Sequence, residues 1–526
     1  MTSAGQTQKK GVFSYFLRFV EWAGNLLPHP VALFAAFCLG VVLLSLVCEL
    51  LGVQVIDPRP EGAKGRTAEG LIAAKNLLSP EGIRWMIMSC VTNFTSFAPL
   101  GTVLVAMLGV GIAESSGLLT TVIRSVVLLS PRRFITPVLV FTGVLSNVAS
   151  EMGYVVMVPM GGFIFLALGR HPLAGMAAVF AGVSGGYSSN LLISTVDPLL
   201  AGITQEAAQL IDPSYTVHAA VNWYFMASSC LIITLSGWYI SDKIVEPRLG
   251  SYRSDNADLH GESSDDYLRK TTELEKKGLV RAGLVTLILA LITAAFLIPE
   301  SGLLRDPNNP GILNSTFLKG IVTFLFLFFL LPSVAYGYTV GSFKSVDDII
   351  EGMSGAMRGL SLYVVLVFFA AQFIAYFKWT NLGFITAVQG AEFLNNIGLT
   401  NAFIFVPFIL VCGFINLTLG SASAQWAVTA PVFVPMLMLL GYSPELIQAA
   451  YRIGDSTTNI ITPMMSYFGL ILAFAHRFDK KLGIGTIIAT MIPYSIAFLV
   501  AWTLWFYLWV FVFGLPVGPG AATFIN

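Results

Sequence analysis

Residues 412–426 read CGFINLTLGSASAQW and residues 451–459 read YRIGDSTTN, and both strings lie within long apolar stretches of the chain. Glycine and small hydroxyl residues interrupt helices, and the backbone carbonyls released in this way are tolerated at membrane depth only where they line a cavity or bind an ion. Asn416, Arg452 and Asp455 add polar and charged side chains that close helix packing does not need. The two strings therefore predict a polar site inside a membrane protein, although glycine and serine could also serve packing alone.

The composition of the whole chain supports a membrane location. Of its 526 residues, 56% are hydrophobic and 11% are charged, and the mean hydropathy is +0.77. Apolar runs long enough to cross about 30 Å of hydrocarbon lie at about 31–53, 99–129, 134–168, 173–196, 217–241, 279–298, 318–338, 359–377, 401–440, 445–475 and 485–513. Several of these runs are too long for one helix or contain glycine and proline. The fold class that they predict is an all-α polytopic membrane protein with roughly nine to eleven membrane elements, some of them re-entrant or broken.

Several classes of protein are disfavoured by what the sequence lacks. The 29 basic and 29 acidic residues balance, so no nucleic-acid partner is expected. The cysteines show no CxxC spacing and the histidines no HExxH spacing, which argues against disulfide or zinc sites. No GxxxxGK[ST] motif is present, and no second carboxylate is placed for an intramembrane aspartyl protease. The sequence thus predicts no enzyme and favours coupling to an ion gradient, with a passive channel as the remaining alternative.

The chain divides into two related halves. The stretch 242–281 is the most polar and predicts a cytoplasmic linker between a first half, 1–241, and a second half, 282–526. Similar short strings occur in the same order in both halves: Phe97–Gly101 and Trp379–Gly383, Gly143–Asn147 and Gly413–Leu417, Pro172 and Pro444, Gly182 and Gly454, Ser188–Leu192 and Thr457–Ile461. Interrupted segments at matching places in two halves indicate a transporter binding site.

Basic residues predict the orientation of the chain in the bilayer. By the positive-inside rule they mark the cytoplasmic side, and they comprise Lys9, Lys10, Arg18, Arg124, Arg132, Arg133, Arg477, Lys480 and Lys481. The tail after Phe513 carries no charged side chain, which fits an outside position. A cytoplasmic N-terminus and a periplasmic C-terminus then require an odd number of crossings.

The charged residues of the second string have two interpretations. Arg452 and Asp455 lie three positions apart and share a helix face. They could simply neutralise each other and lower the cost of insertion. Alternatively, Arg452 receives a substrate carboxylate through a two-pronged hydrogen bond while Asp455 binds a coupling cation or proton. Intramembrane charges favour the functional interpretation, and Asn416 with Asp455 would supply the hard oxygen ligands of a small alkali cation.

Other candidates are less certain. Asp197 follows the first-half copy of the interrupted segment, but an aspartate before a proline can also be a turn or cap residue. Trp426 lies among small polar residues, so it could stack on a planar ligand or could pack in the core. Glu114 and Glu151 are weaker intramembrane candidates.

The segment Asn416 to Trp426, together with Pro444, Arg452, Asp455 and Pro463, resembles the AbgT family of p-aminobenzoyl-glutamate transporters. The resemblance extends over essentially the whole chain, including the polar linker and Asp197. It implies a homodimer in the bacterial inner membrane, whose protomer has about nine transmembrane helices and two re-entrant hairpins in an inverted repeat. Each half would then contain one hairpin and one broken helix.

The resemblance also implies residue roles. The matching transport residues are Asp197, Ser423, Trp426, Pro444, Arg452, Asp455 and Pro463, and a sodium site would use Asn416 and Asp455. No cofactor other than sodium is expected. The implied function is a secondary transporter that exports p-aminobenzoate and sulfonamide antimetabolites by proton antiport. A sodium-coupled importer of p-aminobenzoyl-glutamate is the alternative within the family.

Overall fold

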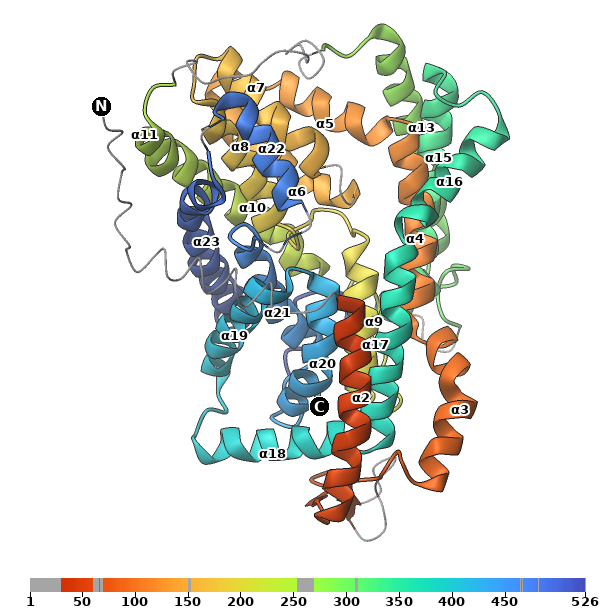
Figure 1. The fold of residues 1–526 in the computed structure, drawn as a ribbon. Helices are drawn as coiled ribbons and strands as arrows, with labels where there is room; N and C mark the ends of the chain where they lie inside the picture. Colours follow the sequence, from red (N-terminus) through yellow and green to blue (C-terminus); the bar gives the residue numbers. More distant parts are fainter. Residues whose placement is uncertain are drawn as a thin grey trace, which may run out of the picture.

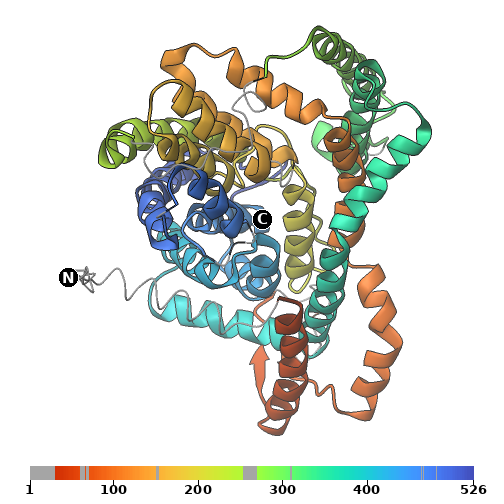
Figure 2. The same ribbon diagram turned by 45° about the horizontal axis from the view of Figure 1, so that its top comes forward.

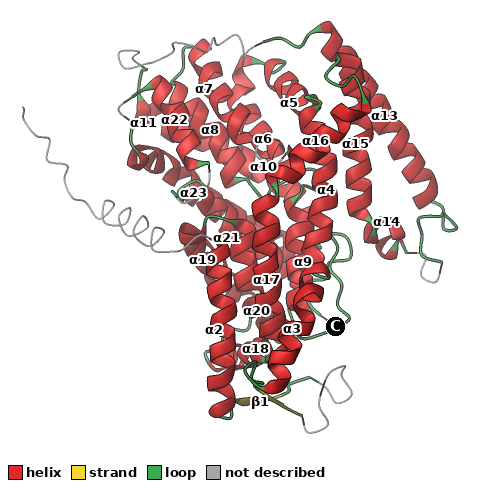
Figure 3. Cartoon of the chain, turned by 45° about the vertical axis from the view of Figure 1, so that its right-hand side comes forward, coloured by secondary structure: helices red, strands yellow, loops and turns green. Residues whose placement is uncertain are grey.

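The computed structural model describes residues 30–59, 66, 70–149, 153–252, 269–307, 311–463, 465, 467–480 and 482–525. Helices make up almost all of this part of the chain, and one small antiparallel sheet, β1 (Gln54–Ile56) with β2 (Leu71–Ala73), lies at one end of the molecule (Figure 3). The candidate Glu151 lies outside the described residues, as does the middle of the predicted linker, residues 253–268. The all-α prediction is confirmed.

Eight helical segments in the described part of the chain are long and apolar enough to cross a membrane. They are Pro30–Leu50 (α2), Pro80–Ser115 (α3, Pro80–Thr95, with α4, Ala98–Ser115), Trp223–Leu249 (α10, Trp223–Ile240, and its extension), Glu273–Leu297 (α13), Ile321–Val340 (α15), Ser361–Trp379 (α17), Ala402–Leu419 (ending with α19, Phe405–Leu419) and Ile484–Val512 (beginning with α23, Ile484–Tyr507). A bent pair, α5 (Leu118–Leu128) and the segment Arg132–Ser146, meets at 115° and is apolar enough to form either a broken span or a re-entrant element. The outer faces of these helices carry many exposed leucine, isoleucine and valine side chains, as contact with lipid requires.

Two helix pairs return to the side from which they start. In the first half, α6 (Ile135–Ser146) leads into α7 (Val158–Ala167), and Arg170 after α7 donates to the Thr136 hydroxyl at the start of α6 at 2.8 Å. In the second half, α19 leads into α20 (Ala422–Met438), and the Tyr442 hydroxyl donates to the Thr400 carbonyl at 3.0 Å. Each pair is therefore a re-entrant hairpin, as the sequence predicts.

The hairpins approach the centre from opposite ends of the molecule. In Figure 1, α7 and the following α8 (Pro172–Phe180) lie near the top, whereas α18 (Leu382–Asn396), which precedes the second hairpin, lies at the bottom. Figure 2 shows the blue C-terminal helices between the gold helices of the first half and the cyan α18. This arrangement is the inverted repeat that the paired sequence strings indicate.

Each hairpin packs against a broken helix at a glycine. In the first half, α8 continues as the π-helix Ala181–Gly185 and is broken before α9 (Val196–Ala208); in the second half, α21 (Pro444–Asn459) is broken before α22 (Phe468–Phe478). A Cβ atom on Gly182 would lie 2.3 Å from the Val140 carbonyl oxygen, and one on Gly454 would lie 2.4 Å from the Ile409 carbonyl oxygen. Only glycine allows two backbones to approach this closely. The two crossings place the interrupted segments of both halves side by side.

Candidate functional site

The helix α21 carries most of the predicted site. It begins where the Ser443 hydroxyl accepts a hydrogen bond from the Leu446 amide at 3.2 Å and Pro444 occupies the first helical turn. Every residue of α21 is buried, including Arg452 and Asp455. Pro463 lies half-buried in the break that follows, where its missing N–H prevents the helix from continuing.

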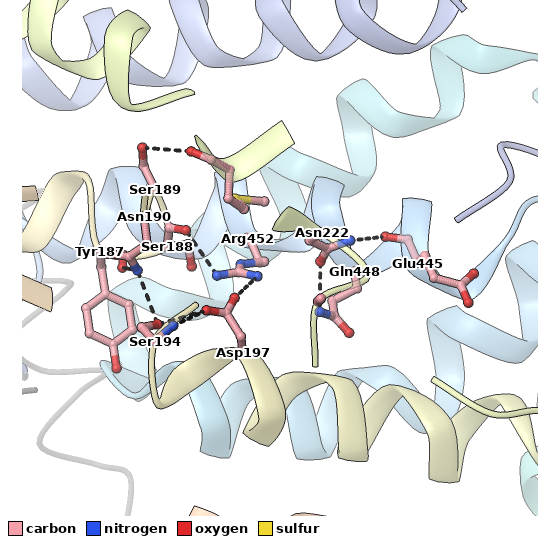
Figure 4. Close-up of polar contacts among 12 residues, drawn as sticks. Tyr187, Ser188, Ser189, Asn190, Ser194, Asp197, Asn222, Glu445, Gln448 and Arg452 are labelled. Carbon is pink, nitrogen blue, oxygen red and sulfur yellow. Dashed lines mark hydrogen bonds and ion pairs between the residues drawn. The ribbon is translucent and has the colours of Figure 1, made fainter. Parts of the chain in front are cut away.

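Arg452 forms its ion pair with the other half of the chain (Figure 4). Its Nη1 atom lies 2.6 Å from Oδ1 of Asp197, and its Nη2 atom donates to the Ser188 carbonyl at 3.0 Å. Oδ2 of Asp197 accepts from the amide and hydroxyl of Ser194 at 2.6 and 3.0 Å. Asp197 also lies in the first turn of α9, where the helix dipole favours a negative charge.

The predicted pairing of Arg452 with Asp455 needs correction. Among the described residues, Asp197 is the carboxylate within ion-pair distance of Arg452. The three-residue spacing does put Arg452 and Asp455 on related faces of α21, but the long arginine side chain reaches across to α9. The α9 carboxylate that it meets is itself oriented by the amide and hydroxyl of Ser194. Asp197 is therefore part of the charged centre as well as a first-turn residue.

Asp455 belongs to a cluster of buried polar groups, in which the Tyr451 hydroxyl lies beside its carboxylate but donates to the Ala422 carbonyl at 2.6 Å. The Asn416 Nδ2 atom donates to the Asp455 carbonyl at 2.8 Å, to the Thr458 hydroxyl at 3.0 Å and to Oδ1 of Asn459 at 2.8 Å. Nε2 of Gln425 donates to the Cys412 carbonyl, one turn before Asn416, at 2.6 Å. These bonds leave Oδ1 of Asn416, Oε1 of Gln425 and both carboxylate oxygens of Asp455 buried without a hydrogen-bond donor in the described structure.

This oxygen cluster fits a small cation or a proton. Buried acceptors without donors are costly, and carboxylate and amide oxygens are the ligands that hard cations prefer. The predicted pair Asn416 and Asp455 lies here, joined by Gln425, to which the sequence analysis gave no role. Its position in the first string, between two hydroxyl residues and Trp426, was the available signal.

A chain of polar side chains ties α21 to the first half. Gln448 accepts from the Thr204 hydroxyl at 2.6 Å and donates to Oδ1 of Asn222 at 2.8 Å, and Nδ2 of Asn222 donates to the Glu445 carbonyl at 2.8 Å. Figure 4 shows Glu445 and Gln448 beyond Arg452 along α21, with Asn222, which precedes α10, bonded to both of them. Sequence reasoning missed these residues, although Glu445, Gln448 and Arg452 follow the three- and four-residue spacing of one helix face.

Trp426 is enclosed by the protein. Its side chain has no exposed surface, its ring stacks on Tyr451 with centroids 4.2 Å apart, and its Nε1 atom donates to the Thr204 hydroxyl at 2.8 Å. The packing interpretation thus describes Trp426 in this conformation, and its ring is not available to a ligand. Ser423, one turn earlier in α20, is half-buried.

A central cavity of about 880 Å³ lies between the two halves. Its lining includes Glu114, Asn147, Tyr154, Tyr187, Thr195, Ser342, Asp348, Glu351, Arg358, Ser421, Ser423, Asn459 and Tyr467. Asn459 connects the cavity to the oxygen cluster, and Thr195 caps the helix that carries Asp197. Tyr154 and Tyr467 stack inside it with centroids 4.7 Å apart. The cavity is thus lined by polar and aromatic side chains, and Asn459 and Thr195 separate it from the buried charged groups.

The charges of the centre do not balance. Asp197 and Asp455 are two buried carboxylates, and Arg452 is the guanidinium between their helices. An uncompensated buried charge is expensive, so a cation or proton at Asp455 would complete the centre. A site that is one positive charge short can couple its conformation to an ion.

Comparisons with known proteins agree with this architecture. The model of the AbgT transporter family matches residues 15–525. The p-aminobenzoyl-glutamate transport protein of Escherichia coli K12 is 39% identical over 502 residues, which cover 95% of this chain and 96% of that protein.

Two solved structures are similar over nearly the full length. MtrF of Neisseria gonorrhoeae, described as illuminating a class of antimetabolite efflux pumps, is 55% identical with a TM-score of 0.90, covering 96% of this chain and 100% of MtrF. The YdaH transporter of Alcanivorax borkumensis is 41% identical with a TM-score of 0.86, covering 94% of this chain and 100% of YdaH. Family and fold agree, and this multi-pass membrane protein belongs to the AbgT family of transporters and is not an enzyme.

Proposed function

We propose that the chain is an ion-gradient-coupled secondary transporter that exports p-aminobenzoate and sulfonamide antimetabolites by proton antiport. The observation that carries the proposal is the donor-free carboxylate of Asp455, buried beside a cavity that both halves line. A proton arriving at Asp455 would remove the excess negative charge, and its departure would restore it. The 55% sequence identity with MtrF, which is described as illuminating a class of antimetabolite efflux pumps, favours export.

The ion pair of Arg452 with Asp197 suggests how an anionic substrate is held. A p-aminobenzoate carboxylate can take the place of the Asp197 carboxylate on the planar guanidinium, provided that Asp197 is neutralised by a proton. Protonation of Asp197 and substrate binding at Arg452 are then linked, and exchange requires the proton and the substrate to be carried in separate steps of the cycle. The side chains in this step are Arg452 and Asp197, with Ser194 orienting the carboxylate.

The oxygen cluster favours a second candidate, sodium-coupled import of p-aminobenzoyl-glutamate. The amide oxygens of Asn416 and Gln425 would add to the Asp455 carboxylate as sodium ligands, whereas a proton needs the carboxylate alone. The relative in Escherichia coli is a p-aminobenzoyl-glutamate transport protein. Both candidates use the same residues, and they differ in coupling ion and direction.

Flux measurements in proteoliposomes test these proposals. Radiolabelled p-aminobenzoate and p-aminobenzoyl-glutamate are followed while proton and sodium gradients are imposed separately. Proton antiport predicts p-aminobenzoate movement against its gradient when only a proton gradient is present. Movement that follows sodium alone supports the second candidate. Flux that merely dissipates the substrate gradient, whatever the ion gradient, would mean a passive channel.

The setting that we propose is a homodimer in the bacterial inner membrane, with a cytoplasmic N-terminus and a periplasmic C-terminus. The basic residues Arg132, Arg133 and Arg477 support this orientation through the positive-inside rule. Labelling of single cysteines placed at either end of α13 from each side of the membrane, and cross-linking in native membranes, test orientation and assembly.

A further inference from the structure

The two halves place an asparagine at the same point of their hairpins. Asn147 follows α6 and Asn416 lies in the last turns of α19, and each comes seven residues after the carbonyl that contacts the broken helix, Val140 in the first half and Ile409 in the second. Asn147 and Asn416 are thus structural counterparts, although their surroundings differ.

The contacts of the two side chains are opposite in character. All donor capacity of the Asn416 amide is directed at α21, through bonds to Asp455, Thr458 and Asn459. Asn147 is only 4% exposed, and neither its Nδ2 nor its Oδ1 atom has a hydrogen-bond partner in the described structure. It lines the central cavity. Its carboxamide is thus a buried donor and acceptor pair in the cavity wall, and a small movement of the side chain would present it to a ligand.

The break in the first half explains why Asn147 lacks these contacts. In the second half α21 runs as a regular helix to Asn459, so it presents the acceptors that Asn416 uses. In the first half the helix ends in a π-helix at Gly185, and residues 186–195 are irregular. Asp455 lies four residues before Asn459, whose first-half counterpart is Asn190. The residue four positions before Asn190 is Gly186, which has no side chain.

We propose that Asn147 binds the amide linkage of a benzoyl-amide substrate in the central cavity. A carboxamide presents one acceptor and two donors, which match the N–H and C=O of a secondary amide. Arg452 pairs with Asp197, and Gly186 stands at the position that corresponds to Asp455, so the first-half crossing itself offers a carboxamide rather than a carboxylate to a ligand. Tyr154 and Tyr467 line the same cavity and offer aromatic surface to the benzoyl ring.

This inference rests on the second candidate function, transport of p-aminobenzoyl-glutamate, because p-aminobenzoate has no amide linkage, and it adds a specificity residue to that function. A site that hydrogen-bonds a polar substrate group discriminates strongly against analogues that lack the group, because its own buried polar atoms are then left unpaired. Asn147 would therefore distinguish p-aminobenzoyl-glutamate from its ester analogue, in which oxygen replaces the amide N–H. Arg452 would read a carboxylate in both compounds, so the difference isolates Asn147.

Equilibrium binding of the amide and of the ester to the purified full-length protein tests the inference. Wild type is expected to bind the amide about tenfold or more tightly than the ester. Asn147→Leu, which is nearly isosteric, should weaken binding of the amide and bring the two affinities within about twofold of each other. Asn147→Ser serves as a smaller second variant if the leucine variant unfolds, and it should reduce the ratio as well.

The control is Asn416→Leu, which should weaken ion-dependent binding of both ligands and leave their ratio as in wild type. An unchanged ratio in both folded Asn147 variants overturns the inference and leaves the proposed function standing. If wild type binds neither compound, the inference fails, while the proposed export of p-aminobenzoate is decided separately by its own flux measurement.

Discussion

The first-half crossing and the second-half crossing are built alike and charged differently. In both, a glycine of the broken helix touches a carbonyl of the hairpin helix, Gly182 on Val140 and Gly454 on Ile409. The second crossing holds its carboxylate within the helix at Asp455, whereas the charge of the first half, Asp197, lies beyond the break and is paired with Arg452. The repeated backbone thus forms one frame around the cavity, and the unequal charges assign the two halves different tasks.

The largest expected effect comes from removing the charge of the second crossing. Asp455→Asn preserves shape but cannot be charged, so gradient-driven transport should be abolished. The protein should still fold and assemble, because the carboxylate oxygens accept no hydrogen bond in the described structure. Uptake in proteoliposomes with imposed gradients measures the first effect, and size-exclusion chromatography the second.

The control for Asp455→Asn is Asp347→Asn, which removes an exposed carboxylate on α16 (Val346–Gly359). It should transport as wild type does. Full coupled transport by a well-expressed Asp455→Asn protein would remove Asp455 from the mechanism and leave Asp197 as the coupling carboxylate.

A smaller effect is expected from the charges that join the halves. Arg452→Lys keeps the positive charge but loses the planar fork, which should reduce affinity for a carboxylate substrate by on the order of 1–3 kcal/mol. Asp197→Asn should also weaken transport, since the guanidinium loses its partner. Substrate binding to each variant, measured with the acid and with its neutral amide analogue, checks this.

The neutral analogue makes the Arg452 prediction specific. It should bind wild type poorly and Arg452→Ala about equally poorly. If acid and amide keep the same affinity ratio in both proteins, Arg452 does not recognise the carboxylate. It would then serve only as the structural partner of Asp197.

Much of this repeated helical architecture could be predicted from the sequence, because membrane spans and the glycines at the helix crossings are recognisable as local sequence patterns. Apolar length predicts the helices, and the matching positions of Gly182 and Gly454 predict the repeat. Partners of long side chains could not be predicted in the same way. The three-residue spacing of Arg452 and Asp455 suggested a local pair, but the actual partner Asp197 is 255 positions away in the chain and becomes adjacent only when the halves fold together.

The hydrogen-bond partners of the polar side chains could not be predicted from the sequence either. Asn147 and Asn416 are the same residue type at matching positions of the two halves. The Asn416 amide donates its hydrogen bonds to α21, whereas the Asn147 amide lies in the cavity wall without a partner in the described structure. The difference arises from the π-helix and the irregular residues 186–195, and no short sequence motif predicts either of them. Gln425 likewise acquires its role only through the orientation fixed by the Cys412 carbonyl.

The two glycines allow the shared frame to be tested directly. Gly454→Ala and Gly182→Ala each force a methyl group against a carbonyl oxygen, at 2.4 and 2.3 Å respectively, and each should destabilise the fold by about 1–3 kcal/mol. Thermal unfolding in detergent measures the effect. Gly283→Ala on α13, where a Cβ atom meets nothing within 4 Å, is the matched control and should be neutral or slightly stabilising. Equal behaviour of all three variants would show that the crossings are not the close contacts described.

The smallest predicted effect decides between packing and ligand stacking at Trp426. Trp426→Phe retains a ring against Tyr451 but loses the indole N–H bond to Thr204, so stability should fall by about 1 kcal/mol. The KM for p-aminobenzoate should stay close to the wild-type value, because the ring has no exposed surface in the described conformation. Trp502→Phe is the matched control, since Trp502 is equally buried, donates to the Ser229 hydroxyl at 2.8 Å and lies away from the cavity lining. Similar losses of stability with unchanged KM in both variants would establish that the two tryptophans pack the frame. A raised KM in Trp426→Phe alone would mean that the ring becomes exposed to substrate in another conformation of the transport cycle, and the second crossing would then recognise the substrate as well as the ion.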